Sequence, residues 1–262
     1  MSKPRYGSKP LHTPAGKIYM IGDVHNEADK LMEVLDQIEP LITPDDHIVF
    51  CGDLFDRGAQ AALTLTVLVD LCKKYPDQVF FVYGNHDFML RNFLLTGSQS
   101  WFKYLLSTLE NWVKEWQLPN MLPETIAQEL EKRGFREITK RTIPYYETEE
   151  VLVTHAPLDR TACYMNGIDC YTQQWEEQEK NPYDGFVYFL EKLDYEILWN
   201  FSDEREEIPH FLKFRVCGHQ PAHHKSPRIF KDRAFIDTGC GKGVRPLTCL
   251  CYPGKKYWQS NP

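Results

Sequence analysis

The sequence predicts an α/β fold with a parallel sheet, and three observations carry this prediction. First, three apolar runs occur in the first third of the chain, and each ends in a glycine followed by a polar residue. Second, none of these runs alternates apolar with polar side chains, which is typical of strands buried on both faces. Third, the two segments between the runs repeat apolar residues with helical spacing. This order of elements is that of βαβαβ units.

The elements of the first half follow in order from this pattern. We expect strands at 18–21, 48–51 and 79–83, with helices at 26–38 and 59–75 between them. The next segment, 89–135, carries leucine and aromatic residues at helical spacing and reads as two or three helices, with a break around 119–123 where two prolines occur.

In the second half of the chain, the apolar runs follow a different pattern. A further strand is expected at 151–153, and a Tyr- and Glu-rich helical segment at 173–198 is interpreted as an insertion. Short apolar runs separated by turns then predict strands at 214–217, 228–230, 234–237 and 247–252. Because these strands follow one another closely, they indicate an antiparallel or mixed sheet.

Composition narrows the class of protein. The 262 residues are 42% hydrophobic and 26% charged, as in an ordinary globular protein, and the net charge of −7 does not favour nucleic-acid binding. No apolar stretch reaches the length of a membrane span or a signal peptide. None of the eight cysteines forms a CxxC pair, so we expect free thiols in a reducing compartment. The expectation is a cytoplasmic protein without nucleic-acid or membrane partners.

Polar side chains follow five of the predicted strands at the point where each strand ends. These candidate metal ligands are Asp23, His25, Asp53, Asn85, His155 and His219. One polar residue after a strand is usually a turn or cap residue. In an open α/β sheet, however, the carboxyl ends of parallel strands converge on one crevice. The systematic placement therefore predicts a single site.

The residue types indicate the chemistry of that site. Imidazole, carboxylate and amide donors without a thiolate suit Mn²⁺, Fe²⁺ or Zn²⁺. Six donors are too many for one catalytic ion, which must keep open positions, so we expect two ions roughly 3.5–4 Å apart that share a carboxylate. Such a pair activates a water molecule and clamps the oxygens of a displacement at phosphorus.

Three segments carry a resemblance to a known family. They are Gly22-Asp23-Val24-His25, the run from Gly52 to Gly58 with sequence GDLFDRG, and Gly84-Asn85-His86-Asp87. They resemble the GDxHG, GDxVDRG and GNHE signatures of the calcineurin-like metallophosphoesterases, in particular the phosphoprotein phosphatase branch. Thr154-His155-Ala156 and Cys217-Gly218-His219-Gln220 resemble the two later histidine motifs of the family. The segment Ile236-Asp237-Thr238-Gly239-Cys240 resembles the one that follows the last histidine in bacterial and phage members. One motif alone would be weak, but the ordered set is specific.

The resemblance implies a fold and a role for each residue. The fold would have four layers, α/β/β/α, with two mixed sheets and helices outside. One catalytic domain would span 17–262 after a flexible N-terminus at 1–16, with helical insertions at about 89–135 and 160–212. Asp23 and His25 would hold the first ion, Asp53 would bridge, and Asn85, His155 and His219 would hold the second. The cofactor would be two divalent ions, with Mn²⁺ first and Fe²⁺ or Zn²⁺ as alternatives.

The same resemblance implies the catalytic groups. A hydroxide bridging the ions would attack phosphorus directly, His86 would protonate the leaving oxygen, Asp56 would orient His86, and Arg57 would bind phosphate oxygens. The second phosphate-binding arginine of the family does not align cleanly. Arg205 is the nearest candidate, with Arg160 and Arg215 behind it.

Two positions depart from the family pattern. Asn26 stands where glycine is usual, although asparagine tolerates positive φ better than most residues. Asp87 replaces the glutamate of GNHE, as in many diadenosine tetraphosphate hydrolases.

Three functions remain open. The Asp56-Arg57-Gly58 triplet favours a phosphomonoesterase acting on phosphoserine, phosphothreonine or phosphotyrosine in proteins or peptides. The alternative is a hydrolase of diadenosine tetraphosphate or a related nucleotide, which uses the same metals and which Asp87 favours. A non-catalytic metal-bound scaffold is disfavoured because every expected ligand, the acid and one arginine are present.

Overall fold

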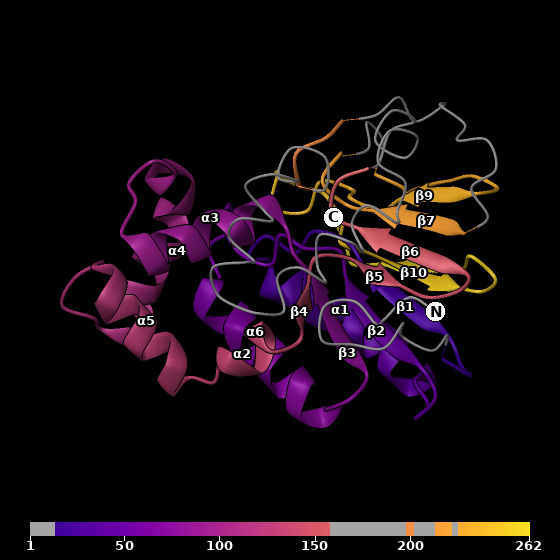
Figure 1. Cartoon of the computed structure of the whole chain (residues 1–262), viewed down its shortest axis with the longest axis horizontal. Coiled ribbons are helices and arrows are strands. Elements are labelled where there is room, and N and C mark those ends of the chain that lie inside the picture. Colours follow the sequence, from indigo (N-terminus) through magenta and orange to yellow (C-terminus); the bar gives the residue numbers. More distant parts are fainter. Residues whose placement is uncertain (1–13, 158–197, 202–212, 222–224) are drawn as a thin grey trace, which may run out of the picture.

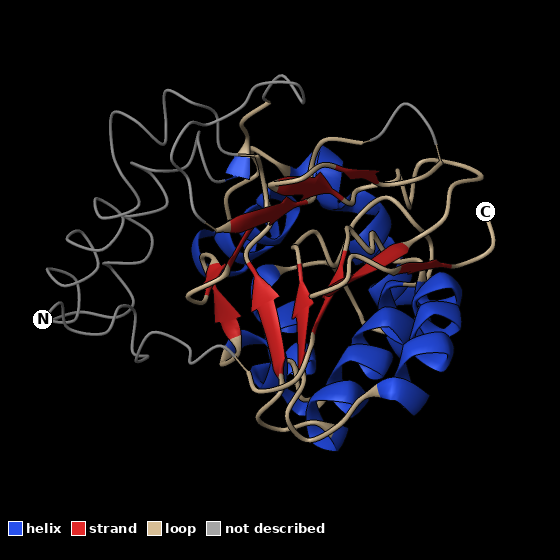
Figure 2. Cartoon of the chain, turned by 90° about the vertical axis from the view of Figure 1, so that its right-hand side faces the viewer, coloured by secondary structure: helices blue, strands red, loops and turns tan. Residues whose placement is uncertain are grey.

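Two mixed β-sheets lie face to face, and helices cover the other face of the first sheet (Figures 1 and 2). The computed structural model describes residues 14–157, 198–201, 213–221 and 225–262. The first sheet has the order β11-β10-β1-β2-β3-β4. Its strands are β1 (Ile18–Ile21), β2 (His47–Phe50), β3 (Val79–Val82), β4 (Thr142–Ile143), β10 (Thr248–Tyr252) and β11 (Tyr257–Gln259). The strands β1 to β4 are parallel, and β10 and β11 add antiparallel pairs.

The second sheet has the order β5-β6-β7-β9-β8. Its strands are β5 (Tyr146–Glu147), β6 (Val151–Thr154), β7 (Phe214–Cys217), β8 (Arg228–Ile229) and β9 (Arg233–Phe235). The central pairs β6–β7 and β7–β9 are parallel, whereas the edge strands β5 and β8 are antiparallel to their neighbours. This is the mixed sheet that the close spacing of short strands indicates.

The helices lie beside the first sheet. They are α1 (Ala28–Ile38), η1 (Glu39–Leu41), α2 (Ala61–Lys74), α3 (Asn85–Thr96), α4 (Phe102–Trp116), α5 (Pro123–Lys132) and α6 (Arg136–Thr139). In Figure 1, α2 to α6 occupy the side opposite to β6, β7 and β9. The break between α4 and α5 falls where it was predicted, around the two prolines in 119–123. Among the described residues, no helix is long and apolar enough to cross a membrane.

Alternate residues of β1, β2, β3 and β10 in the first sheet belong to two separate cores. On β1, Tyr19 and Ile21 pack with the helices, while Ile18 and Met20 face the second sheet. Successive side chains of a strand point to opposite faces of the sheet. Because both faces of β1 are buried, every residue of this strand is apolar. The predicted α/β architecture with two mixed sheets and outer helices is confirmed. The predicted insertion at 160–212 and the predicted helix at 173–198 lie outside the described residues apart from 198–201.

Most predicted elements agree with the structure within two residues, with two kinds of exception. The strands β4, β5 and β11 and the short helices η1 and α6 were not predicted, because two to four residues give too little pattern to detect. The helix expected from residue 89 begins at Asn85, because Gly84 serves as its N-cap and Asp87 returns its side chain to the Gly84 N–H.

Candidate metal centre

The loops that follow β1, β2, β3, β6 and β7 bring the six sequence-predicted ligands together. Asp23, His25, Asp53, Asn85 and His155 are all buried. The backbone there is unusual, because the described non-glycine residues with positive φ include His25, Asn26, Asp53, Asp56, Arg57 and His219. Left-handed conformations cost free energy and persist where the surrounding structure imposes them, often at functional sites. Asn26 has φ of 59°, which shows why asparagine is acceptable in place of glycine.

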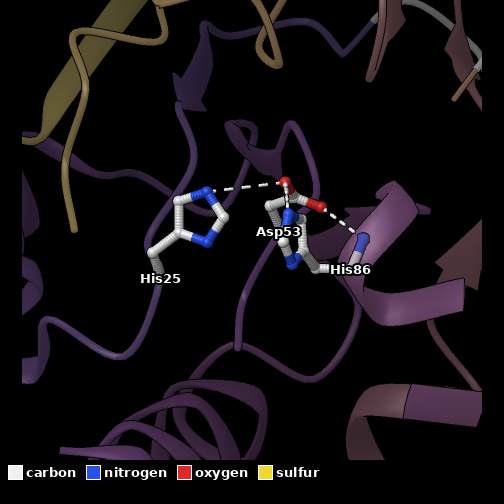
Figure 3. Close-up of side chains that lie close together, drawn as sticks. All are labelled: His25, Asp53 and His86. Carbon is white, nitrogen blue, oxygen red and sulfur yellow. Dashed lines mark hydrogen bonds and ion pairs between the residues drawn. The ribbon is translucent and has the colours of Figure 1, made fainter. Parts of the chain in front are cut away.

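Asp53 belongs to both groups of candidate ligands, and Figure 3 shows it beside His25 and His86. Its Oδ2 is 3.5 Å from His25 Nε2 and its Oδ1 is 3.4 Å from His155 Nε2. The ligand atoms of His25, Asp53 and His86 form one cluster, and those of Asp53, His155 and His219 form another. Asp53 is the residue that both clusters share, as expected of a bridging carboxylate.

The hydrogen bonds of two histidines orient their rings toward Asp53. His25 Nδ1 is 3.3 Å from the Phe55 carbonyl oxygen, and His155 Nδ1 is 2.8 Å from the Cys51 carbonyl oxygen. A carbonyl can only accept, so each Nδ1 carries the proton and each Nε2 presents a lone pair to the site. A second hydrogen bond of this kind is the usual way in which proteins orient a metal-binding imidazole.

The Asn85 side-chain oxygen tests whether a cation fits. This oxygen lies 2.9 Å from His155 Nε2, 3.3 Å from His219 Nδ1, and 3.2 and 3.3 Å from the two Asp53 carboxylate oxygens. The two carboxylate oxygens are acceptors, and so is His155 Nε2 in the tautomer that Cys51 imposes on His155. Convergent acceptors repel one another unless a donor or cation lies among them. If the Asn85 amide were turned, its NH₂ group would supply a hydrogen-bond donor. A divalent ion would be bound by all of these acceptor atoms, so this set of ligand atoms fits the expected metal.

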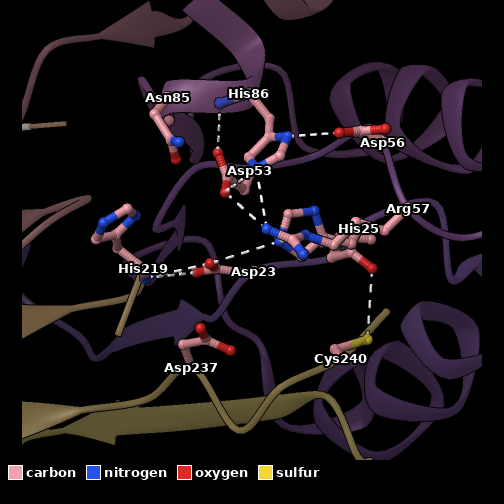
Figure 4. A network of polar contacts seen from close by, with 12 residues as sticks. Asp23, His25, Asp53, Asp56, Arg57, Asn85, His86, His219, Asp237 and Cys240 are labelled. Carbon is pink, nitrogen blue, oxygen red and sulfur yellow. Dashed lines mark hydrogen bonds and ion pairs between the residues drawn. The ribbon is translucent and has the colours of Figure 1, made fainter. Parts of the chain in front are cut away.

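Asp23 completes the site from the β1 side. Both of its carboxylate oxygens accept from the His219 backbone N–H at 3.1 Å, and its Oδ2 is 3.9 Å from His25 Nε2. Burial raises the pKa of Asp23 well above its usual value, and the carboxylates of Asp237 and Asp53 raise it further. Figure 4 shows Asp237 beside Asp23. Sequence reasoning treated Asp237 only as part of a motif segment, and it did not identify this buried carboxylate as a neighbour of the site.

The charges of Asp53 and the imidazoles suit metal binding. Burial alone would raise the pKa of Asp53, but the surrounding histidines, His155 first, hold it below its usual range. Burial lowers the pKa of His25 and His155, and it lowers that of His219 to about 3. An ionised carboxylate and neutral imidazoles are the protonation states in which these groups bind divalent ions.

His86 and Asp56 form a separate pair at the edge of the cluster (Figure 4). His86 Nδ1 is 2.6 Å from Asp56 Oδ2, so His86 Nε2 faces the cluster, 3.9 Å from Asp53 Oδ2. Burial alone would lower the pKa of His86, but Asp53 and the hydrogen bond that Asp56 accepts from His86 raise it. A protonated imidazole held by a carboxylate can donate a proton from its other nitrogen.

Arg57 lies between the two histidines of the β1 side. Its Nε donates to His25 Nε2 at 3.2 Å, and its Nη2 is 3.1 Å from His86 Nε2. The guanidinium therefore occupies the lone pair with which His25 would bind an ion. Binding of an ion by His25 Nε2 therefore requires Arg57 to turn away from this atom.

Sequence reasoning missed the residues that support Asp56 and Asp53. Ser107 Oγ donates to Asp56 Oδ1 at 3.1 Å, and Thr108 Oγ1 accepts from the Asp56 N–H at 2.9 Å. Asp87 accepts from the backbone N–H groups of Asp53, at 2.8 Å, and Leu54, at 3.1 Å. Ser107 and Thr108 lie on a helix some fifty residues away in sequence, and no local motif marks them.

The second phosphate-binding arginine stays a prediction. Arg205 and Arg160 lie outside the described residues. Arg215 is in β7, and its Nη2 donates to Asp232 Oδ2 at 2.7 Å. The described contacts of Arg215 therefore serve the second sheet and do not place it at the site.

Comparisons with known proteins identify the family of the chain. Residues 16–234 match the family of calcineurin-like phosphoesterases. The chain is 27% identical to the asymmetrical bis(5'-nucleosyl)-tetraphosphatase PrpE of Halalkalibacterium halodurans, over 89% of each chain. It is 36% identical to the PP2A-like serine/threonine phosphatase PPG1 of Candida albicans over 70 residues, which are 27% of this chain and only 16% of that protein.

A solved structure shares the fold. The cold-active protein-tyrosine phosphatase of a psychrophilic Shewanella species superposes with a TM-score of 0.63 at 17% identity, over 96% of this chain and 80% of that one. The family match covers most of the chain, and its relatives are phosphatases and tetraphosphatases. The chain therefore belongs to the calcineurin-like phosphoesterase family, and it is a hydrolase that acts on phosphoesters.

Proposed function

We propose that the chain is a dinuclear-metal-dependent protein phosphatase that hydrolyses phosphomonoesters on protein or peptide side chains. The observation that carries the proposal is the 2.6 Å contact between His86 Nδ1 and Asp56 Oδ2. Hydrolases of diadenosine tetraphosphate, which resemble this chain in the same motifs, usually lack an aspartate at the position of Asp56. From composition we further propose a cytoplasmic location and one catalytic domain over 17–262.

In the proposed site, different residues bind the metal ions and the phosphate. Asp23, His25, Asp53, Asn85, His155 and His219 would hold two divalent ions, for which we propose Mn²⁺, with Fe²⁺ or Zn²⁺ as alternatives. When bound, the ions would lower the pKa of water and neutralise charge on the phosphate. Arg57 would leave the nitrogen atoms of His25 and His86 and bind phosphate oxygens with its planar fork.

His86 would serve as the general acid. Its Nε2 would donate a proton to the leaving oxygen, while Asp56 keeps the Nδ1–H in place and stabilises the charged imidazolium. Arg205 stays a proposed second phosphate contact on the strength of the sequence alone.

A second function is favoured by a specific comparison. The tetraphosphatase PrpE matches 89% of this chain, whereas the serine/threonine phosphatases match less than a third of it. Asp87, which replaces the usual glutamate, is also shared with many diadenosine tetraphosphate hydrolases. Hydrolysis of diadenosine tetraphosphate is therefore the alternative to be tested in parallel.

The test is turnover by metal-free protein reconstituted in turn with Mn²⁺, Fe²⁺ and Zn²⁺. The substrates are a phosphothreonine peptide, a phosphotyrosine peptide, p-nitrophenyl phosphate and diadenosine tetraphosphate. We expect metal-dependent phosphate release from a peptide at a kcat/KM well above that for the dinucleotide. A dominant dinucleotide rate would support the alternative, and no turnover with any ion would contradict both.

A further inference from the structure

A chain of aromatic side chains extends from His86. The ring of Tyr104, on α4, lies 6.3 Å from the His86 imidazole, centroid to centroid, and perpendicular to it. Trp101, which is the N-cap residue of α4, lies 6.2 Å from Tyr104. Trp101 also stacks on Trp199 at 5.6 Å with an interplanar angle of 30°. We call Trp101, Tyr104 and Trp199 the aromatic wall.

Helix α4 places Tyr104 at this point for a geometric reason. Tyr104, Ser107 and Thr108 are spaced i, i+3 and i+4, so they share one face of the helix. Because Ser107 and Thr108 contact Asp56, Tyr104 lies on the same face one turn earlier, beside the His86 that Asp56 holds. The face of α4 that orients the proton donor therefore also presents an aromatic ring next to it.

The exposure of Tyr104 indicates that packing of the protein core does not account for an aromatic residue at this position. The side chain is 41% exposed, whereas Leu105 and Trp112 of the same helix are fully buried. Lys103 Nζ lies 4.7 Å from the Tyr104 ring centroid, so a positive charge lies beside this ring. An exposed aromatic ring beside an acid–base residue is suited to binding part of a substrate.

We propose that the aromatic wall binds the leaving group and selects phosphotyrosine over phosphothreonine and phosphoserine. This inference rests on the proposed function, because it takes His86 as the donor to the leaving oxygen. In phosphotyrosine, an aromatic ring is bonded directly to that oxygen, so it lies within a few ångströms of His86. Aromatic rings attract one another at centroid separations of 4.5–7 Å. Phosphoserine and phosphothreonine place only one or two aliphatic carbon atoms at this distance.

A second aromatic residue provides an internal comparison. Phe201 lies 4.8 Å from the ring of His219 and is 65% exposed. It therefore borders the other cluster, away from the proposed proton donor. The proposal predicts that Phe201 does not discriminate between leaving groups.

The test measures kcat/KM for two peptides of identical sequence that differ only in carrying phosphotyrosine or phosphothreonine. We expect Tyr104→Ala to lower kcat/KM for the phosphotyrosine peptide by about three- to tenfold, the range of an aromatic pair, and to change the phosphothreonine value less than twofold. Tyr104→Phe keeps the ring and should keep both values. Equal losses for both peptides with Tyr104→Ala would overturn the proposal.

Two control variants separate the subsite from general effects. Tyr257, on the edge strand β11, is 42% exposed, so Tyr257→Ala removes a matched ring from the first sheet's edge. We expect this variant to leave the ratio of the two kcat/KM values unchanged, and Phe201→Ala to do the same. A ratio that changes with Phe201→Ala as much as with Tyr104→Ala would overturn the placement of the leaving group beside His86.

Small substrates distinguish failure of this inference from failure of the proposed function. If neither peptide is hydrolysed, the protein-phosphatase proposal fails, and p-nitrophenyl phosphate and glycerol 2-phosphate replace the peptides as aryl and alkyl substrates. A loss with Tyr104→Ala confined to the aryl phosphate would still support an aryl-binding wall. Equal losses, or a loss confined to diadenosine tetraphosphate, would overturn it.

Discussion

The Asp56 carboxylate contacts both His86 and helix α4, and these contacts fix its orientation. One oxygen is 2.6 Å from His86 Nδ1 and the other accepts from Ser107 Oγ at 3.1 Å. The positive φ of 80° at Asp56 is held by the bond from its own N–H to Thr108. At the residue scale, the proposed proton donor is therefore supported by Ser107 and Thr108. The hydrogen bonds described for these two hydroxyl groups involve Asp56 and Asn26, which are not candidate metal ligands.

The variant His86→Asn separates proton transfer from metal binding. General acid catalysis contributes roughly 10²–10⁴-fold, so we expect kcat to fall by that order, while the protein retains both ions. The matched variant Asp53→Asn removes the charge shared by both clusters, and it should lose metal as well as activity. Turnover and metal content per chain are measured together. Turnover near that of the wild type in His86→Asn would contradict the role of His86.

The variant Ser107→Ala tests whether Ser107 positions Asp56. Losing one hydrogen bond to a carboxylate costs about 1 kcal/mol, which corresponds to about a fivefold loss of kcat if the bond matters in the transition state. We expect KM and metal content to stay unchanged, because Ser107 contacts neither ligand nor substrate. Ser100→Ala, which removes an exposed hydroxyl just before α4, is the control. Equal kcat values for the two variants would show that Asp56 needs no support from Ser107.

At the element scale, the loops after the strands are held by close backbone approaches and by α4. A Cβ atom on Gly84 would overlap the backbone nitrogen and Oδ1 of Asp53, and one on Gly218 would overlap Oδ1 of Asp23. The glycines of the motifs therefore allow carboxylates to approach the neighbouring loop. Thr108 links two further loops, because its hydroxyl accepts from Asn26 Nδ2 at 2.8 Å and from the Asp56 N–H.

The variant Thr108→Val keeps the shape of Thr108 and removes its hydroxyl. Two buried donors, Asn26 Nδ2 and the Asp56 N–H, lose this acceptor, and an unsatisfied buried donor costs about 1–3 kcal/mol. We expect Tm to fall by roughly 4–8 °C for a loss near 2 kcal/mol in a chain of this size. Thr66→Val is the control, because the Thr66 hydroxyl on α2 is exposed. A Tm unchanged from the control would contradict the linking role.

The elements also show what the sequence could and could not predict. The strands β1, β2 and β3 were predictable because each is a continuous apolar run that ends at a motif. The convergence of the six candidate ligands was predictable because parallel strands share an edge. The strands β4 and β5 were not predictable, since they are two residues long and are defined only by pairing with distant partners. The roles of Ser107 and Tyr104 depend in the same way on where α4 packs.

At the scale of the whole molecule, the two sheets meet through a mainly apolar core, and His47 makes a polar contact across it. His47, on β2 of the first sheet, lies 2.7 Å by its Nδ1 from the hydroxyl of Tyr146, on β5 of the second. The His47 ring also packs 4.9 Å from the ring of Phe80. Burial lowers the pKa of His47, and nearby Asp46 opposes this shift. The junction between the sheets therefore favours a neutral imidazole.

A neutral imidazole at this junction makes stability depend on pH. In the unfolded chain His47 takes up a proton near pH 6.5, whereas in the folded protein it does so only at lower pH. Below pH 6.5 the unfolded state therefore binds more protons, and the free energy of unfolding falls. We expect urea unfolding of metal-free protein to show a smaller loss of stability between pH 7.5 and pH 5.5 in His47→Gln than in the wild type. Tyr146→Phe is the control: it keeps the imidazole, so it should lower stability at both pH values and retain the pH dependence, and equal pH dependence in His47→Gln and the wild type would show that the junction does not sense protonation.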